Sequence, residues 1–539
     1  MAMTTVFLAF GGLYYQTASD TVFPTYIFGI YSGGSNALPD TFGCFSGISK
    51  CFNLLYQHGV GTDIYDWFQF ISVFFCSAYW SYHLIRSRIA LWLMIPVVAS
   101  LLDPFMPFEF SKTSMLLSVT GLHIIHSDGR LLAYIFGICL FSLGFLVRPE
   151  PVIICMILFF AATLLHLRSS LKPLKTLALP VLAVMVLSAV FLNSSRTKED
   201  IYYREFRKYE YTLVDFRKGQ IDDVQLNPVD KMKLQAAQGF FFADREALNT
   251  SFFKEIGIQP LDKTPVSLLR AFWKTEWTYD GLSRFTTGIF NLKFHFLCLL
   301  LTGLLLWNKN RAKVLVLTMA LLLIVGFSVF LKTENHFISS SMMTTFLLIG
   351  VLKDRIPDGS ESENRSTPVF ILVRMLFASL LMIVEKVQLV SASKRTSEYY
   401  NSVQDKLEHL NPETLVYNIS YWDKLHYRLF SPVQPEGSYK ATVIDGGALY
   451  LNEDYQGLMS DRTGRSRFED QFLYLVEEGR FFVSSQKRMS LMTDYMNVVH
   501  GLGLQYETLM MFPSNDSTLN SKSIGIHKFS LHRSGKDEQ

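Results

Sequence analysis

Long apolar runs separated by short polar stretches dominate the first 385 residues of the chain. A helix that crosses a bilayer needs about 20 predominantly apolar residues, and by this measure the pattern predicts about eleven membrane spans. The expected spans are residues 2–18, 66–85, 89–103, 110–126, 130–147, 151–168, 175–193, 292–308, 313–331, 335–352 and 367–385. We therefore predict a mainly α-helical, polytopic membrane bundle over residues 1–385.

The pattern changes after residue 385, where short apolar runs alternate with amphipathic helical stretches. Expected helices cover 392–409, 465–478 and 487–500, and expected strands cover Thr414–Ile419, Ala441–Ile444, Arg480–Ser484, Tyr506–Phe512 and Ile524–Leu531. Strands that alternate with helices favour a small α/β sheet domain. Residues 386–539 are therefore predicted to form a separate soluble domain.

Basic residues are concentrated in every second loop between the predicted spans. These loops hold Arg86, Arg88, Arg130, Arg168, Lys172, Lys175, Lys309, Arg311, Lys313, Lys353, Arg355 and Arg365. The intervening short loops, together with the stretch 20–64, hold Lys50, Arg148 and Lys332, with Lys112 at a span boundary left out of the count. Because cytoplasmic loops collect Lys and Arg, this asymmetry places the N-terminus inside and the C-terminal domain outside.

Three large pieces then lie on the outer side: residues 20–64, 194–290 and 386–539. In the first, apolar residues at helical spacing over Phe42–Tyr56 predict helices lying along the membrane surface. A packed cap that shields the bundle is the other interpretation. For most of 194–290 a packed outer domain is favoured.

Composition removes several classes of function. A net charge of +3 is too small to suggest a nucleic-acid partner. Four of the six cysteines lie inside apolar runs, so no disulfide framework is expected. The sequence has no Walker A loop and no dinucleotide or zinc-protease motif, so ATP-driven transport by this chain alone is not expected.

Charged side chains at the predicted outer ends of the spans are the candidates for chemistry. An Arg and a Glu flank Pro149 after the fifth span, and a polar turn joins the ninth and tenth spans. Such groups bind a phosphate or pair with each other, whereas interfacial anchoring or a plain turn is the simpler interpretation. The candidate substrate-binding residues are Arg148, Glu150, Lys332, Glu334 and His336.

The architecture resembles the GT-C superfamily of integral-membrane glycosyltransferases, in particular bacterial members linked to surface polysaccharides. The resemblance rests on the many spans, the surface helices of the first outer loop and the soluble outer domain. It also rests on Ser19-Asp20, Leu54-Leu55-Tyr56 before Asp66-Trp67, the polar fourth span from Thr113, and Arg148-Pro149-Glu150. It implies a multi-pass protein of the bacterial inner membrane with a periplasmic C-terminal domain.

The resemblance also implies a reaction: transfer of a sugar from a polyprenyl-phosphate donor to an envelope glycan or lipid acceptor. A carboxylate would accept the acceptor's hydroxyl proton, with Asp20 as first choice and Asp40 as second. Cationic groups would stabilise the departing phosphate, and Arg148 and Lys332 are chosen for this role, supported by His336. Some members use a divalent cation held by carboxylates, and the sequence does not decide whether this chain does.

Three other interpretations stay open at this stage. An O-antigen-type polymerase or ligase also has many spans and a large outer loop. A transporter for a lipid-linked sugar would move its substrate without forming a glycosidic bond. A structural assembly protein would have outer domains that bind envelope partners and no site for chemistry.

Overall fold

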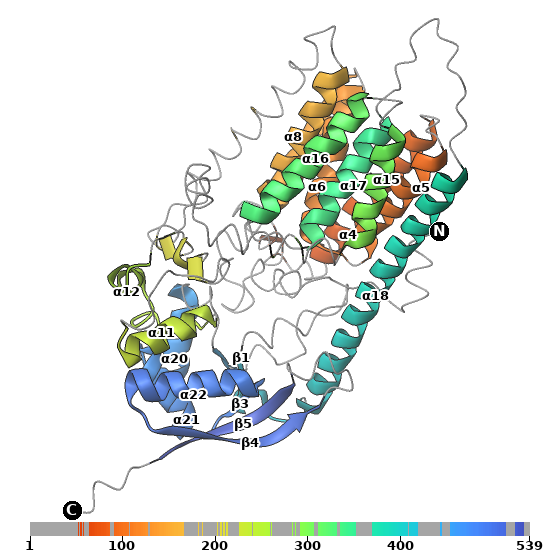
Figure 1. The fold of residues 1–539 in the computed structure, drawn as a ribbon. Helices are drawn as coiled ribbons and strands as arrows, with labels where there is room; N and C mark the ends of the chain where they lie inside the picture. Colours follow the sequence, from red (N-terminus) through yellow and green to blue (C-terminus); the bar gives the residue numbers. More distant parts are fainter. Residues whose placement is uncertain are drawn as a thin grey trace, which may run out of the picture.

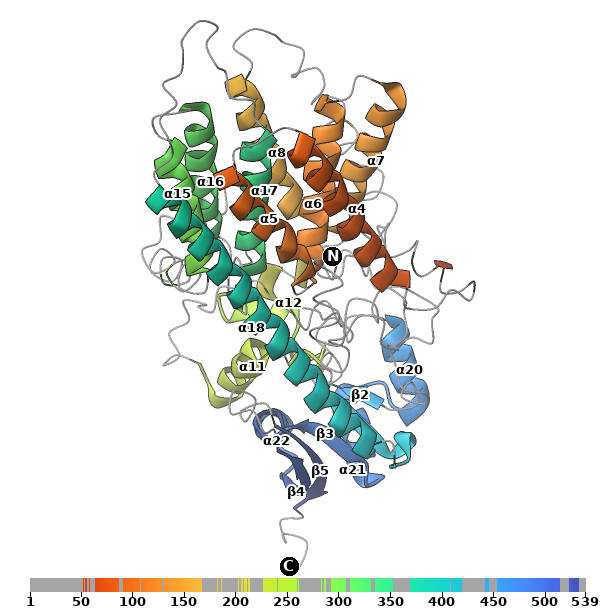
Figure 2. The same cartoon turned by 90° about the vertical axis from the view of Figure 1, so that its right-hand side faces the viewer.

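The computed structural model describes most of a helical bundle and most of a C-terminal α/β domain (Figures 1 and 2). The described residues are 64–86, 91–106, 108–127, 130–166, 226–239, 241–258, 292–306, 311–330, 335–351, 369–407, 409–418, 442–444, 453–513 and 523–532, with single residues and short runs between them.

The bundle consists of helices packed around one apolar core. They are α4 (Ile64–Arg86), α5 (Leu91–Leu102), η3 (Asp103–Phe105), α6 (Phe110–Ser127), α7 (Leu131–Val147), α8 (Pro149–His166), α15 (Lys293–Leu306), α16 (Arg311–Phe330), α17 (Asn335–Val351) and the first half of α18 (Val369–Leu407). Each of these α-helices lies where an apolar run predicted one.

The prediction of about eleven membrane spans is wrong. In the described part of the chain, one helical stretch is long and apolar enough to cross a membrane, Leu372–Leu407 in α18. The other helices contribute six shorter apolar stretches, each of 10–17 described residues. One helix that meets the length and hydropathy criteria is weak support for membrane integration, because core helices of soluble proteins meet them too.

The physical reason for the lower number is that several apolar runs are short or diluted by polar residues. α5 has 12 residues and contains Pro96. α6 carries serine, threonine and histidine along its length. The predicted span 2–18 and almost all of 175–193 lie outside the described residues. The predicted span 367–385 and the predicted helix 392–409 form one continuous helix, α18.

α6 is the central helix of the bundle and contacts α4, α7, α8 and α17. All its residues from Phe110 to Ile125 are buried. Glycines allow α7 to approach α6 closely: a Cβ on Gly121 would lie 2.5 Å from the carbonyl oxygen of Gly137. A Cβ on Gly144 would lie 2.6 Å from the carbonyl oxygen of Ser114. Small residues at a helix interface permit this kind of backbone contact.

Large apolar side chains cover much of the outer surface of the bundle. Those exposed on α4, α7, α15 and α18 are Trp67, Ile71, Phe74, Phe75, Ile85, Leu131, Leu132, Ile135, Phe136, Leu297, Leu300, Leu304, Val369, Phe370, Val373, Leu376, Phe377, Leu380 and Val384. We call this set the apolar belt. Exposed apolar side chains in this number on one bundle are typical of a surface that contacts lipid or other protein.

The C-terminal domain is built on a five-stranded mixed sheet with strand order β2-β1-β3-β5-β4. β1 runs parallel to β2 and β3, whereas β5 is antiparallel to β3 and β4. Its elements are η6 (Pro412–Thr414), β1 (Leu415–Asn418), β2 (Thr442–Ile444), α20 (Glu453–Thr463), α21 (Phe468–Glu477), β3 (Phe481–Ser485), α22 (Gln486–His500), β4 (Leu504–Phe512) and β5 (Ile524–Leu531). All five strands lie where the alternating pattern predicted them.

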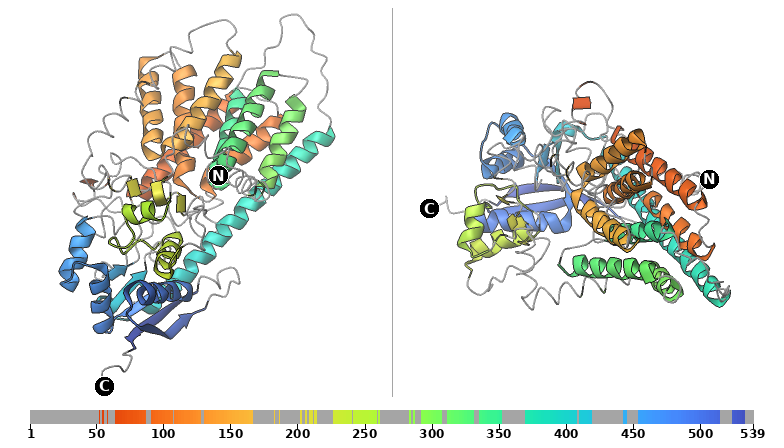
Figure 3. Two further views of the ribbon diagram at one scale, coloured as in Figure 1. Left: turned by 60° about the vertical axis from the view of Figure 1, so that its left-hand side comes forward. Right: turned by 90° about the horizontal axis from the view of Figure 1, so that it is seen from above.

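The described part of the loop 194–290 shares the core of the C-terminal domain. Helix α11 (Pro228–Gln238) packs against α22, and α12 (Thr250–Glu255) lies close by (Figure 3). Phe241 contacts the rings of both Phe468 and Tyr495. The apolar residues of this segment and of the sheet domain therefore form one cluster, although they are far apart in the sequence.

α18 runs from the far end of the bundle to the C-terminal sheet (Figures 1 and 2). Met375 and Ala378 belong to the core of the bundle, and Tyr400 and Val403 belong to the core of the sheet domain. The Tyr399 hydroxyl donates to the carbonyl of Phe512 and accepts from the backbone N–H of Ile524. The helix thus passes through the predicted domain boundary at residue 385 without a break.

Candidate functional site

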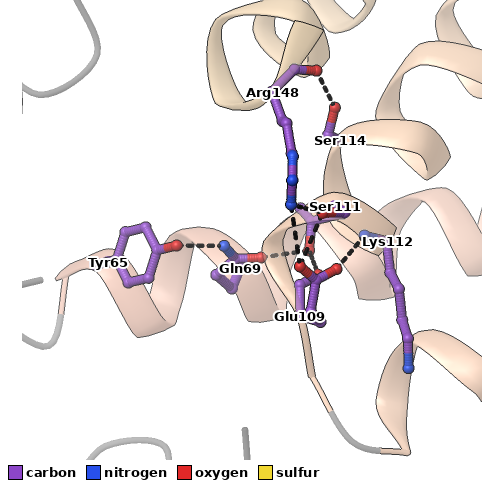
Figure 4. A network of polar contacts seen from close by, with 8 residues as sticks. Tyr65, Gln69, Glu109, Ser111, Lys112, Ser114 and Arg148 are labelled. Carbon is purple, nitrogen blue, oxygen red and sulfur yellow. Dashed lines mark hydrogen bonds and ion pairs between the residues drawn. The ribbon is translucent and has the colours of Figure 1, made fainter. Parts of the chain in front are cut away.

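An arginine and a buried carboxylate meet where α6 begins and α7 ends, at one end of the bundle (Figure 4). Arg148 Nη1 lies 3.7 Å from Glu109 Oε1 and donates to the Ser111 hydroxyl. The Arg148 guanidinium also lies over the Phe110 ring, 4.8 Å from its centroid. The Glu109 side chain is fully buried, whereas the Arg148 side chain is 24% exposed. The guanidinium is therefore held by Glu109, Ser111 and Phe110 and its Nε is buried, while the Arg148 side chain as a whole is partly exposed.

Glu109 is held by donors at the start of α6. The Ser111 hydroxyl donates to Glu109 Oε1 at 2.8 Å, and the Lys112 backbone N–H donates to Oε2 at 3.0 Å. The first turn of a helix has backbone N–H groups without intrahelical acceptors, so a carboxylate just before α6 suits this position. Glu109 therefore caps α6 and at the same time pairs with Arg148.

The junction of α7 and α8 fixes the other partner. Arg148 is the single residue between these helices, and its backbone N–H donates to the carbonyl of Gly144. The Ser114 hydroxyl is shared between the carbonyl oxygens of Gly144 and Arg148, each at 2.8 Å. The close glycine contact between α6 and α7 thus sets the position of Arg148 over Glu109.

A chain of polar side chains extends from Glu109 to α4. The Thr113 hydroxyl donates to Gln69 Oε1, and Gln69 Nε2 donates to the Tyr65 hydroxyl at 2.8 Å. All three residues are buried. Phe52 packs edge-on against Tyr65, with the ring centroids 5.7 Å apart. This polar chain ties the first turns of α4 and α6 together beneath the arginine.

A second buried group of charges lies beside the first. Lys112 Nζ lies 3.5 Å from Asp103 Oδ1, and Lys386 Nζ contacts the same oxygen. The side chains of all three residues are at most 4% exposed. His295 Nδ1, at the start of α15, lies 3.5 Å from Glu385 Oε2. These groups join η3, α6, α15 and α18, so α18 is anchored to the base of the Arg148 site.

Burial and charge act differently on the two carboxylates. Burial raises the pKa of Glu109 to about 7, even though Arg148, Ser111 and Lys112 favour its ionised form. Burial would also raise the pKa of Asp103, but the Lys112 and Lys386 ammonium groups outweigh it and hold the pKa below its ordinary value. Asp103 is therefore ionised at neutral pH, and Glu109 can gain or lose a proton there.

Of the predicted site residues, only Arg148 has a described side chain. Glu150 lies in α8 and His336 lies in α17, but the structure does not describe their side chains. Asp20, Asp40, Lys332 and Glu334 lie outside the described residues altogether. Their predicted roles stay predictions.

Glu109 and Lys386 are among the charged partners of the site that were not predicted site residues. Each is an ionisable residue beside or within an apolar run, which is the signal that would have found them. Nothing in the sequence indicated that Glu109 pairs with Arg148, because the two residues come together only through the packing of α6 on α7.

Within the part of the chain that the structure describes, no group of three or more His, Cys, Asp or Glu side chains is arranged to hold a metal ion. Asp103, the most deeply buried aspartate of the site, has two ammonium groups as neighbours. Those ammonium groups would repel a cation at this carboxylate.

Comparison with protein-family models, with curated proteins and with solved structures finds no match to this chain.

Proposed function

We propose that this chain is a membrane-bound transferase that moves a sugar from a polyprenyl-phosphate donor to an envelope glycan or lipid acceptor. The observation that carries the proposal is Arg148, whose guanidinium is held by Glu109 and Ser111 and whose side chain is 24% exposed at one end of an apolar bundle. A guanidinium offers paired N–H donors that match phosphate geometry.

The chemistry needs two kinds of group. The acceptor hydroxyl oxygen forms a bond to the anomeric carbon as the bond from that carbon to the phosphate oxygen breaks. The phosphate keeps the bonding electron pair, and a fixed cation stabilises the charge that develops on it. A carboxylate takes the proton of the acceptor hydroxyl. In this proposal Arg148 is the fixed cation.

Asp20 is the proposed base, with Asp40 as second choice, on the strength of the sequence alone. Glu109 is not chosen, although its pKa is raised. Its side chain is fully buried, and its two oxygens already accept from Ser111 and from the backbone of Lys112. Its part is to orient Arg148.

The placement in a membrane is supported by the apolar belt and by the long apolar helix α18. A lipid tail would lie against the belt while the donor's phosphate reaches Arg148 at the bundle end. In our proposal the site and the C-terminal domain face the periplasm.

The test is release of free polyprenyl phosphate from a panel of polyprenyl-phosphate sugars by the purified protein in lipid. Asp20→Asn is measured beside the wild type. Release that is lost in Asp20→Asn supports both the reaction and the base. Release that persists in Asp20→Asn refutes the assignment of the base. No release from any monosaccharide donor contradicts the proposal, and release from an oligosaccharide diphosphate alone then favours a polymerase.

A further inference from the structure

His500, the last residue of α22, bridges two carboxylates from different segments. Its Nε2 lies 2.7 Å from Asp244 Oδ2, and its Nδ1 lies 3.0 Å from Glu469 Oε2. Asp244 belongs to the segment 239–248, which follows α11, and Glu469 lies in the first turn of α21. One imidazole thus connects three parts of the chain, and it does so far from the Arg148 site.

Both contacts can be hydrogen bonds only when the imidazole carries two protons. A neutral imidazole has one N–H donor and one acceptor nitrogen, and an ionised carboxylate has only acceptors. In the neutral state one of these two short contacts would therefore bring two acceptors together. The protonated ring, in contrast, donates one N–H to each carboxylate.

The two carboxylates are unequally fixed. Asp244 is 3% exposed and also accepts from the Tyr495 hydroxyl and from the backbone N–H of Ala247. Glu469 is 33% exposed and can turn toward water. When His500 loses a proton, its remaining N–H stays with Asp244, and the Glu469 contact is the one that breaks.

One other ion pair joins the segment 239–248 to α21: Arg467 Nε, at the N-cap of α21, lies 3.4 Å from Glu246 Oε2. Its side chains are 63% and 65% exposed, so this pair contributes little beside the His500 link. α22 packs against α11, β3, β4 and β5, and the segment 239–248 and α21 also contact its C-terminal end. The ionisable residues of these elements and of α22 itself are Asp230, Lys231, Lys233, Asp244, Arg245, Glu246, Glu469, Asp470, Tyr474, Glu477, Lys487, Arg488, Asp494, Tyr495, Tyr506, Glu507, His527 and Lys528. Of these, Asp244 and Glu469 are the charges that act on His500.

We propose that His500 is a pH-sensitive clip that fastens the segment 239–248 and α21 to the end of α22, and that opens on the Glu469 side as the pH rises. The segment that it holds also packs through Phe241 on Phe468, in the same turn of α21 as Glu469. Opening the clip therefore loosens this junction while leaving the sheet intact.

The direction of the pH effect follows from the ring's surroundings. Burial alone would lower the pKa of His500, but the hydrogen bonds and charges of Asp244 and Glu469 outweigh it and raise the pKa. A histidine whose pKa is higher in the folded state contributes its stabilisation fully below the unfolded pKa. It loses that stabilisation as the pH rises through the folded pKa.

Hydrogen–deuterium exchange of the full-length protein tests the clip, with protection factors corrected for the intrinsic effect of pH. Protection of residues 239–248 and of the first turn of α21 should fall as the pH rises from about 5 to about 8.5. The expected fall is about fivefold, because only the partly exposed Glu469 contact is lost and the Asp244 contact stays. Strand β3 should keep its protection.

Glu469→Gln should reduce the pH dependence, because a neutral amide remains a partner for either form of the ring. Glu477→Gln, an exposed glutamate at the other end of α21, is the matched control and should behave as the wild type. His500→Gln should abolish the pH dependence, and the exposed His409→Gln should not. The proposal is overturned if Glu469→Gln and Glu477→Gln give the same profile, or if protection falls equally throughout the sheet domain.

Discussion

Glu109 Oε1 lies 3.7 Å from Arg148 Nη1, so a buried carboxylate and a partly exposed arginine side chain form an ion pair at the end of the bundle. Because Glu109 is the more deeply buried partner, an anion from outside would approach Arg148 and not Glu109. The state of Glu109 therefore governs how much of the positive charge of Arg148 is available to an anion.

This relationship predicts a pH effect on donor binding. The pKa of Glu109 is raised to about 7, so the residue becomes neutral as the pH falls below that value. A polyprenyl-phosphate sugar is a phosphodiester whose charge does not change in this range. The wild type should bind it about tenfold more tightly at pH 6 than at pH 8.5. At pH 6 neutral Glu109 no longer competes with the donor phosphate for Arg148, and a competing interaction of about 1.4 kcal/mol corresponds to a tenfold change in affinity.

Glu109→Gln is the matched variant for this effect, because the amide oxygen still accepts from the Lys112 backbone. It should bind the donor equally at both pH values. The same raised pKa stabilises the folded protein below about pH 4.5, and this contribution is lost as the pH rises through about 7. A pH dependence of binding that is unchanged in Glu109→Gln would show that another group titrates.

Lys386→Met should destabilise the bundle, because it leaves the buried carboxylate of Asp103 with one ammonium partner instead of two. Removing one partner of a buried ion pair costs about 3 kcal/mol. Thermal unfolding of the purified protein in lipid measures this. Lys394→Met is the control on the same helix, since Lys394 is 35% exposed and its pair with Glu398 is worth less than about 0.5 kcal/mol. Equal shifts in both variants would mean that the Asp103 pair contributes nothing.

Gly121→Ala should destabilise the α6–α7 contact by about 2 kcal/mol, because its Cβ would meet backbone atoms of Gly137 and Phe141 at 2.5 and 2.7 Å. It should also weaken donor binding, since this contact positions Arg148 over Glu109. Gly303→Ala, where the only close atom is the flexible end of Leu317, is the matched control and should be nearly neutral. The comparison uses chemical or thermal unfolding of both variants, and a tolerated Gly121→Ala would refute the proposed close contact.

Local sequence patterns predicted the helices and strands well, but they overestimated the number of membrane-spanning helices. The strands of the C-terminal sheet coincide with short apolar stretches that can be recognised in the local sequence, as β3 and β5 illustrate. The apolar run of α5, by comparison, was counted as a span although its helix has 12 residues. An apolar run records that a helix is buried or apolar, and it does not record whether protein or lipid surrounds it.

The Arg148 site could not be predicted from local sequence patterns, because it is formed by packing between segments that are far apart in the sequence. Arg148 was a candidate because a lone arginine follows an apolar run. Its partner Glu109 is far away in the sequence and reaches it through the glycine contact of α6 and α7. The pairing of Lys386 with Asp103 likewise joins the start of the bundle to its last helix.

The most direct test of the central claim is binding of a polyprenyl-phosphate sugar to Arg148→Ala, measured beside Arg130→Ala at the opposite end of α7. If Arg148 binds the donor's phosphate, Arg148→Ala should lose affinity or release of polyprenyl phosphate by on the order of 10²-fold, and Arg148→Lys should recover part of it. Arg130→Ala should retain both. Equal binding and release by wild type and by a folded Arg148→Ala would contradict the account.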